Sequence, residues 1–276
     1  MKFTTLVSVN DVAQFSAPHV IVDCRSQLAN TEWGEQEYRQ LHIAGARYAH
    51  LERDLSGPIV RGQTGRHPLP SAAQLCDVFS RLGIGRDCQV FAYDQDNGAY
   101  SARLWWLLRW LGHDAVAVID GGWRAWQQAG LATSNVVPTV TAQLFVGVTQ
   151  ADKVVDANDV LHRDEHCIAI DARGANRFAG RDETIDPVAG HIPAARSFPF
   201  TENVDQNAQF LSHDDLRARF AALKDKQVIS YCGSGVTACH NILAMVHSGL
   251  PEPHLYAGSW SEWICDPKRP IATGSD

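Results

Sequence analysis

The chain carries two copies of one sequence pattern, and this repeat constrains its fold more than any other feature of the 276 residues. Four short segments recur in the same order, as VDCRS and IDARG, HIAGA and HIPAA, VFAYD and VISYC, and GGWRAW and GSWSEW. The interval from Tyr93 to Trp123 is one residue longer than that from Tyr231 to Trp260, so the spacing recurs as well. The repeat predicts two similar domains, at residues 1–138 and 139–276, joined near the Thr- and Val-rich segment around Pro138.

Each copy alternates short β-rich runs with helical stretches. Residues 90–94 are followed by a helical pattern over 101–111, and residues 228–231 by one over 238–246. This alternation predicts an α/β fold in which each domain is a parallel sheet with helices on both faces. Ligands of such sheets bind beyond the carboxyl ends of the strands, so we expect the chemistry of the second copy just after residue 231.

Cys232 stands at that point, in the sequence VISYCGSGVTA. Gly233 and Gly235 allow the backbone to turn tightly before the helix that begins near Ala238. Successive N–H groups of the turn, and the positive end of the helix dipole, would then face the sulfur. A thiolate needs about 2.7 kcal/mol of stabilisation to predominate at neutral pH, and a helix end supplies about 0.3 to 1 of that. Converging N–H groups at roughly 1.5 to 3 kcal/mol each supply the rest, so the pattern predicts an anionic sulfur nucleophile at Cys232.

The first copy carries Asp94 at the position of Cys232, followed by QDNGAYSA in place of GSGVTA. A carboxylate cannot carry sulfur, so the first domain is predicted to be a degenerate copy that packs against the second. The six other cysteines precede no glycine-rich turn and are predicted to be buried core residues. They are Cys24, Cys76, Cys88, Cys167, Cys239 and Cys265.

No metal or other cofactor is expected. The seven cysteines include no CxxC pair, which argues against a disulfide framework and against a zinc site. Two histidine pairs have helical spacing, but no carboxylate or cysteine accompanies them in a ligand pattern, so we interpret them as solvated side chains. The pairs are His162 with His166 and His240 with His247.

Composition limits the partners. A net charge of -7 gives no reason to expect a nucleic acid or an anionic membrane as partner, and 45% hydrophobic residues suffice for packed cores. The N-terminal segment has no apolar stretch of signal-peptide length, and no later segment has the apolar length of a membrane span. We therefore expect a soluble, cytoplasmic protein.

Together these motifs resemble the tandem-domain rhodanese family, the thiosulfate and 3-mercaptopyruvate sulfurtransferases. The resemblance covers nearly the whole chain, and CGSGVTA is its most specific element. It implies that Cys232 takes a sulfane sulfur from a small anionic donor, holds it as a persulfide, and passes it to cyanide or to a small or protein thiol. It also implies that the residues after the cysteine bind the donor or the sulfur: Gly233, Ser234, Gly235, Val236 and Thr237.

The resemblance implies further donor-binding residues. Arg177 matches the arginine of an R-F segment that binds the donor's oxyanion. The family's mercaptopyruvate members have a second arginine in an E-P-R segment, whereas this chain reads RDETIDPVAG there, which leaves Arg181 as a substitute. His42 matches a first-domain histidine that comes near the donor, although a conformational role would equally explain it. Neither thiosulfate nor 3-mercaptopyruvate is favoured at this point.

Two other functions fit a reactive cysteine in such a loop. A cysteine-based phosphatase requires an arginine six residues after the nucleophile, where this chain has Ala238, so the transferring phosphoryl group would lack its clamp. A noncatalytic module that stores persulfide for a protein partner would keep the same fold and loop. This second alternative stays open.

Overall fold

The structure is a computed structural model, and it describes residues 2–274. The chain forms two compact units, and these do not follow a single cut in the sequence. The first unit takes the chain up to Gly57, Pro70–Gln150 and Gln206–Phe210, and the second takes Pro58–Leu69, Ala151–Asp205 and the chain from Leu211 onward. The predicted domain boundary between residues 138 and 139 stays a prediction, because these units describe packing rather than independent folding.

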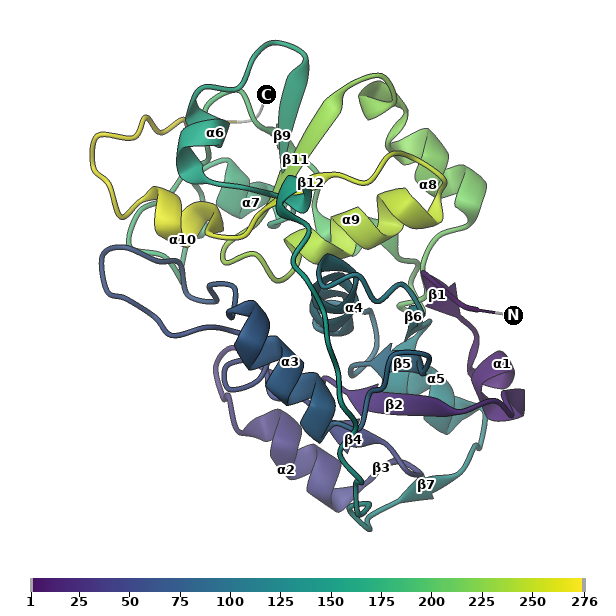
Figure 1. The fold of residues 1–276 in the computed structure, drawn as a ribbon. Helices are drawn as coiled ribbons and strands as arrows, with labels where there is room; N and C mark the ends of the chain where they lie inside the picture. The colour runs from purple at the N-terminus through teal and green to yellow at the C-terminus, as the bar shows by residue number, and fades with distance from the viewer. Residues whose placement is uncertain (1, 275–276) are drawn as a thin grey trace. The chain divides into compact units, whose positions relative to one another are not determined.

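The first unit is built on a five-stranded parallel sheet in the order β1-β6-β5-β2-β4. Its strands are β1 (Leu6–Val7), β2 (His19–Asp23), β4 (Arg47–Tyr48), β5 (Gln89–Tyr93) and β6 (Val116–Ile119). A short antiparallel pair, β3 (His42–Ile43) with β7 (Thr133–Ser134), lies outside this sheet. The helices are α1 (Val9–Gln14), α2 (Trp33–Gln40), α3 (Ala72–Arg81), α4 (Ser101–Trp110) and α5 (Gly122–Gln128) (Figure 1).

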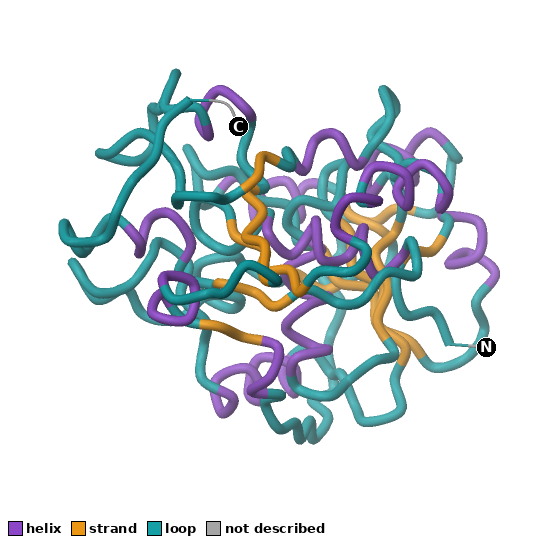
Figure 2. Tube along the Cα trace, turned by 90° about the horizontal axis from the view of Figure 1, so that it is seen from above, coloured by secondary structure: helices purple, strands orange, loops and turns teal. Residues whose placement is uncertain are grey.

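The second unit repeats this plan with a five-stranded parallel sheet in the order β8-β12-β11-β9-β10. Its strands are β8 (Val154–Val155), β9 (Cys167–Asp171), β10 (Arg196–Ser197), β11 (Gln227–Tyr231) and β12 (His254–Tyr256). Its α-helices are α6 (Ala157–Leu161), α7 (Ala175–Phe178), α8 (His213–Arg219), α9 (Ala238–His247) and α10 (Ser259–Trp263), with 3-10 turns at Ala151–Lys153, Phe200–Asn203 and Ala221–Leu223. Loops, drawn teal in Figure 2, connect these short elements.

The two sheets have the same strand order, which confirms the predicted α/β fold of two similar units with helices flanking parallel sheets. The register also recurs, since Asp23 of β2 is level with Tyr93 of β5, and Asp171 of β9 is level with Tyr231 of β11. Carboxyl ends of neighbouring parallel strands meet at one edge of a sheet. The D-x-R segment and the cysteine loop of the second copy therefore lie at the same edge.

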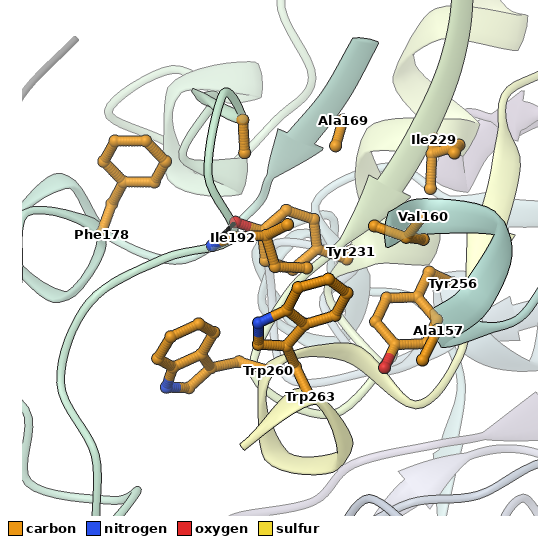
Figure 3. Close-up of a cluster of buried hydrophobic side chains, with 11 residues drawn as sticks. Ala157, Val160, Ala169, Phe178, Ile192, Ile229, Tyr231, Tyr256, Trp260 and Trp263 are labelled. Atoms are coloured by element: carbon orange, nitrogen blue, oxygen red, sulfur yellow. Dashed lines mark hydrogen bonds between the residues drawn. The ribbon is translucent and has the colours of Figure 1, made fainter. Parts of the chain in front are cut away.

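A cluster of buried side chains fixes the second unit's sheet to its last helix. Figure 3 shows Tyr231 of β11 near Trp260 and Trp263 of α10, and all three are at most 1% exposed. Burial of such aromatic side chains contributes about 1.5 to 3 kcal/mol each. Because Trp260 also donates its backbone N–H to the Cys232 carbonyl at 2.9 Å, this packing ties α10 to the cysteine loop.

Across residues 2–274, no helix combines the length and the apolar character that crossing a membrane requires.

Candidate active site around Cys232

Cys232 follows β11 directly and begins the loop that leads into α9. The backbone N–H groups of Ser234 and Gly235 donate to its Sγ, at 3.4 Å and 3.1 Å. The residue is 2% exposed, so the sulfur is buried but faces polar hydrogens. The turn of amides around the sulfur that the two glycines predict is present, and it favours an anionic group at Sγ.

The loop is held from one side by the segment before and within α10. Cys232 donates its backbone N–H to the Ser259 hydroxyl at 3.0 Å, and Ser261 donates its N–H to the Gly233 carbonyl at 3.0 Å. Gly235 has φ of 80°, and a Cβ there would lie 3.1 Å from the carbonyl carbon of Ala257 and nearer still to its oxygen. Only glycine fits this position, so the N–H that makes the shorter bond to the sulfur depends on it.

The first unit shows what the same loop does when its leading residue is already an anion. The Asp94 carboxylate accepts backbone N–H groups from Gly98 at 3.0 Å, Tyr100 at 2.8 Å and Ser101 at 3.0 Å. Burial raises the pKa of Asp94, and these N–H donors act in the opposite direction. The carboxylate oxygens of Asp94 are one bond further from the main chain than Cγ, just as the outer sulfur of a Cys232 persulfide would be one bond further than Sγ. The Asp94 carboxylate therefore occupies a position in its loop that corresponds to that outer sulfur. The degenerate copy thus retains an anion-binding loop, with its own side chain bound in it.

Arg177 of α7 reaches the cysteine loop. A Cβ built on Gly233 would lie 3.6 Å from Arg177 Nη2 and 3.7 Å from its Nη1. Two carboxylates hold the guanidinium: its Nε donates to both oxygens of Glu183, at 3.1 Å and 2.9 Å, and its Nη2 donates to Asp186 at 3.0 Å. Arg181 is exposed and lies outside this set of contacts among the described residues.

The sequence analysis missed two residues of this site, Arg66 and His67. They belong to Pro58–Leu69, the segment of the first half that packs in the second unit. Arg66 forms an ion pair with Asp186, and its Nη2 would lie 2.8 Å from a Cβ on Gly233. His67 is buried, and its Nδ1 lies 2.7 Å from the Ser234 hydroxyl oxygen. The segment has no counterpart among the repeated motifs. The adjacent basic residues Arg66 and His67 are the one feature of its sequence that could have indicated a functional site.

The two carboxylates under the arginines have different environments. Although burial disfavours its ionised form, hydrogen bonds from Arg177 and from the N–H groups of Ile185 and Asp186 hold the pKa of Glu183 below its usual range. Burial raises the pKa of Asp186 against the attraction of Arg66. Glu183 also lies 3.5 Å from Arg173, the arginine of the second D-x-R segment. The carboxylates therefore act as buried anchors that orient the arginines.

His42 lies in the first unit, where it is fully buried. Its Nδ1–H donates to the Tyr38 carbonyl at 2.6 Å, and its ring stacks on Tyr38 with centroids 4.1 Å apart. His191 is the equivalent residue of the second copy. Its Nδ1 lies 2.8 Å from the Phe178 carbonyl oxygen, and its ring stacks on the Phe178 ring with centroids 3.7 Å apart. This shared arrangement gives the histidine a conformational role in both copies, and contact of His42 with a donor stays a prediction.

The remaining predicted residues have mixed surroundings. Val236 is buried, and Thr237 is half-buried and makes no side-chain capping bond to α9. The expectation that all six other cysteines are buried was wrong for four of them: Cys24 and Cys239 are buried, but Cys76, Cys88, Cys167 and Cys265 are partly exposed. In the described part of the chain, no group of three or more His, Cys, Asp or Glu residues is arranged to hold a metal ion.

The chain matches the family described as "Rhodanese-like domain" twice, over residues 9–129 and 152–265. The two matches together cover most of the chain, one in each copy of the repeat.

The similar proteins are described as sulfurtransferases of two kinds, some named for 3-mercaptopyruvate as the donor and others for thiosulfate. A Pseudomonas aeruginosa protein described as a probable 3-mercaptopyruvate sulfurtransferase is 46% identical over 270 residues, 95% of each chain. The thiosulfate sulfurtransferase of Bos taurus is 31% identical over 256 residues, 88% of this chain and 84% of that one. The crystal structure of SseA from Escherichia coli, described with the 3-mercaptopyruvate sulfotransferases, has a TM-score of 0.82 and 31% identity, covering 94% of this chain and 100% of that one.

Proposed function

The chain belongs to the rhodanese family and is a sulfurtransferase, and we propose that it moves a sulfane sulfur from 3-mercaptopyruvate or thiosulfate to cyanide or a thiol through a persulfide on Cys232. The observation that carries this proposal is the pair of loop N–H groups that donate to Cys232 Sγ. The N–H groups of Ser234 and Gly235 would stabilise negative charge on the thiolate, on the transition state and on the persulfide.

Two sulfur transfers complete the cycle. The Cys232 thiolate attacks the donor sulfur and forms an S–S bond while the donor's bond to that sulfur breaks. From thiosulfate the electron pair of the broken bond leaves with sulfite, and from 3-mercaptopyruvate it leaves on carbon as the enolate of pyruvate. The nucleophilic acceptor, cyanide or a thiolate, then attacks the outer sulfur, and the S–S electron pair returns to Cys232. No oxidant or cofactor takes part in either step.

We propose 3-mercaptopyruvate as the better donor, on the basis of charge. Residues 233–237 carry no cation. Arg66 and Arg177 beside them already share Asp186, and Arg177 also binds Glu183. A dianion such as thiosulfate would therefore meet little uncompensated positive charge, whereas the single carboxylate of 3-mercaptopyruvate suits a guanidinium fork.

Ser234 and His67 also favour 3-mercaptopyruvate over thiosulfate, because sulfur transfer from a thiol donor includes a proton transfer. The carbon of 3-mercaptopyruvate that loses sulfur must gain a proton to become the methyl group of pyruvate, and the donor's thiol proton can supply it. We propose that the Ser234 hydroxyl relays this proton, because it lies 2.7 Å from His67 Nδ1 in the loop that begins at Cys232. Thiosulfate carries no such proton.

The proposal is tested by incubating the protein with each donor and weighing it intact. A covalent intermediate requires a mass gain of one sulfur atom, which cyanide then removes with formation of thiocyanate. A module that only stores persulfide would also gain this mass, but its turnover with small acceptors such as cyanide would be negligible. A wild-type protein that gains no mass with either donor would refute the proposal.

Ser234→Ala is expected to separate the two donors. We expect kcat/KM for 3-mercaptopyruvate to fall about 100-fold, because proton relay typically contributes 10²- to 10⁴-fold, and kcat/KM for thiosulfate to fall much less. Steady-state rates with both donors measure this, and His67→Ala should show the same split. Equal losses with both donors would contradict the relay and indicate instead that Ser234 shapes the loop.

Arg177→Ala is expected to lower kcat/KM for the donor about 10- to 100-fold, because charged hydrogen bonds contribute about 1.5 to 3 kcal/mol. Arg181→Ala, measured beside it, tests the contribution of the exposed arginine that the resemblance also implies, and we expect less than a threefold change because a solvated charge interacts weakly. An unchanged kcat/KM in Arg177→Ala would remove this residue from the proposed donor site.

A further inference from the structure

We propose that Ser259 is a positioning residue for Cys232, and that its hydroxyl holds the main chain of the nucleophile during both sulfur transfers. The inference rests on the proposed function and deepens it, because it concerns how Cys232 keeps its place while its sulfur changes bonds. Ser259 is the first residue of α10, outside the CGSGVTA motif, and it is separated from Cys232 by 27 positions in the sequence.

The backbone of Ser259 is strained. Its φ of 54° lies in the left-handed region, which glycine adopts freely and which is unfavourable for a residue with a side chain. Four non-glycine residues in the described part of the chain have a positive φ, and Ser259 is the only buried residue among them. Residues under such strain cluster at functional sites, so the strain at Ser259 calls for a function of its side chain.

The first copy of the repeat has glycine at the equivalent position. Gly122 has φ of 53°, and the residue after it donates its N–H to the Asp94 carbonyl at 2.8 Å. In the second copy, the residue after Ser259 makes the same bond to the Cys232 carbonyl, at 2.9 Å. Both copies therefore share the backbone conformation, but only the second has a side chain where glycine would be unstrained.

The Ser259 hydroxyl bonds to the main chain of the nucleophile. It accepts the Cys232 N–H at 3.0 Å and donates to the Tyr256 carbonyl at 2.9 Å, and Ser259 is fully buried. Because Trp260 donates its N–H to the Cys232 carbonyl, both polar groups of the Cys232 main chain are held by the start of α10. These bonds fix the peptide planes on both sides of Cα, and thereby the direction in which Cβ and Sγ point.

The main chain is the part of Cys232 that can be held throughout the cycle. Sγ attacks the donor sulfur in the first transfer and is the leaving group in the second, so its contacts with the loop change in each turnover. Asp94 undergoes no such reaction, and three loop N–H groups hold its carboxylate at 3.0 Å or less. Glycine at residue 122 therefore suffices in the first copy, whereas the nucleophile of the second needs the serine hydroxyl.

The packing of α10 holds Ser259 in its strained conformation. Trp260 is fully buried, lies near Tyr231 (Figure 3), and donates its indole N–H to the Val188 carbonyl at 2.8 Å. Burial of this side chain stabilises the start of α10 and offsets the strain of the residue before it. The core of the second unit therefore sets the position of the hydroxyl before any donor binds.

The test compares Ser259→Gly and Ser259→Ala, with Ala194→Gly as the matched control. Ala194 is exposed and has φ of 57°, so Ala194→Gly relieves the same kind of strain without removing a side-chain hydrogen bond. We expect both Ser259 variants to lower kcat/KM for the donor and kcat/KM for cyanide about 10- to 100-fold, because a small displacement of a reacting group can cost 10²-fold in rate. Ala194→Gly should stay within about twofold of wild type for both substrates.

Two comparisons separate positioning from other roles. Loss of a donor-binding residue lowers kcat/KM for the donor alone, whereas loss of a residue that positions Cys232 slows both the attack and the departure of its sulfur. Thermal unfolding separates positioning from stability. Ser259→Ala keeps the strain and Ser259→Gly removes it, so Ser259→Gly should unfold at the higher temperature and yet be no more active.

Wild-type values of both kcat/KM terms in Ser259→Gly would overturn the inference. A loss confined to the donor, an equal loss in Ala194→Gly, activity that follows thermal stability, or loss of cooperative unfolding in Ser259→Gly would overturn it as well. After long incubation with donor, both Ser259 variants should still gain the mass of one sulfur atom, because Cys232 is intact. Absence of sulfur uptake by the wild-type protein would instead overturn the proposed function, so the two failures are distinguishable.

Discussion

Cys232→Ser is expected to abolish sulfur uptake and to lower turnover by roughly 10⁴-fold or more, in the range seen when a covalent nucleophile is removed. A serine hydroxyl is about the size of the thiol, but it ionises far less readily and cannot form the S–S bond of the intermediate. The two N–H groups now at 3.4 Å and 3.1 Å from Sγ would still have an oxygen to bind, so the loop should keep its shape. The loss would therefore report chemistry rather than folding.

The matched control is Cys239→Ser. Cys239 is buried in α9, and its Sγ lies 3.3 Å from the Gly235 carbonyl, to which a serine hydroxyl can also donate. Intact mass with each donor and the rate of thiocyanate formation should be close to wild type in Cys239→Ser and absent in Cys232→Ser. Sulfur uptake by Cys232→Ser would place the intermediate on another residue and refute the assignment of the nucleophile.

Gly235→Ala is expected to lower kcat/KM about 100-fold or more with either donor. The φ of 80° costs an L-residue about 1 to 3 kcal/mol, and the added Cβ would collide with the Ala257 carbonyl. The loop must then shift and withdraw the N–H that lies 3.1 Å from Cys232 Sγ. Removing one such donor to a developing anion typically costs 10²- to 10³-fold in rate.

Gly45→Ala separates the two causes, because Gly45 also has φ of 80° but nothing lies within 4 Å of an added Cβ. The equivalent residue of the second copy is already an alanine, Ala194, at φ of 57°. Steady-state rates and the rate of Cys232 alkylation should change strongly in Gly235→Ala and little in Gly45→Ala, whereas thermal unfolding should show the cost of the positive φ in both variants. Wild-type activity in Gly235→Ala would show that the amide is not needed by the sulfur.

Much of the fold follows from local patterns. The helical pattern over 101–111 became α4 (Ser101–Trp110), and that over 238–246 became α9 (Ala238–His247). The strands predicted at 90–94 and 228–231 differ from β5 and β11 by a single residue at one or both ends. The repeat predicted two equivalent sheets because two copies of one pattern satisfy the same packing rules, and their identical strand order confirms this.

The cysteine loop was predictable for a similar reason. A strand end, two glycines and a helix start fix the direction of a few consecutive N–H groups, and all of these lie within a dozen residues of sequence. Partial burial of four cysteines was not predictable in this way, because exposure at the margin of a core depends on what packs over it. The hydrogen bonds of Asp94 were not predictable either. The sequence shows that an aspartate replaces the cysteine, but not that N–H groups of the following loop donate to its carboxylate.

The sequence by itself determined the two parallel sheets and the place of Cys232 at the end of a central strand, because each depends on neighbours in the chain. The tertiary structure alone decided that residues 58–69 pack in the second unit and bring Arg66 and His67 to the loop of Cys232. His67 and Ser234 are separated by 167 positions, and no periodicity or spacing encodes their contact. Such contacts arise from packing between distant segments, here anchored by the buried Asp186 and the Ser261 hydroxyl, and packing is a property of the folded chain as a whole.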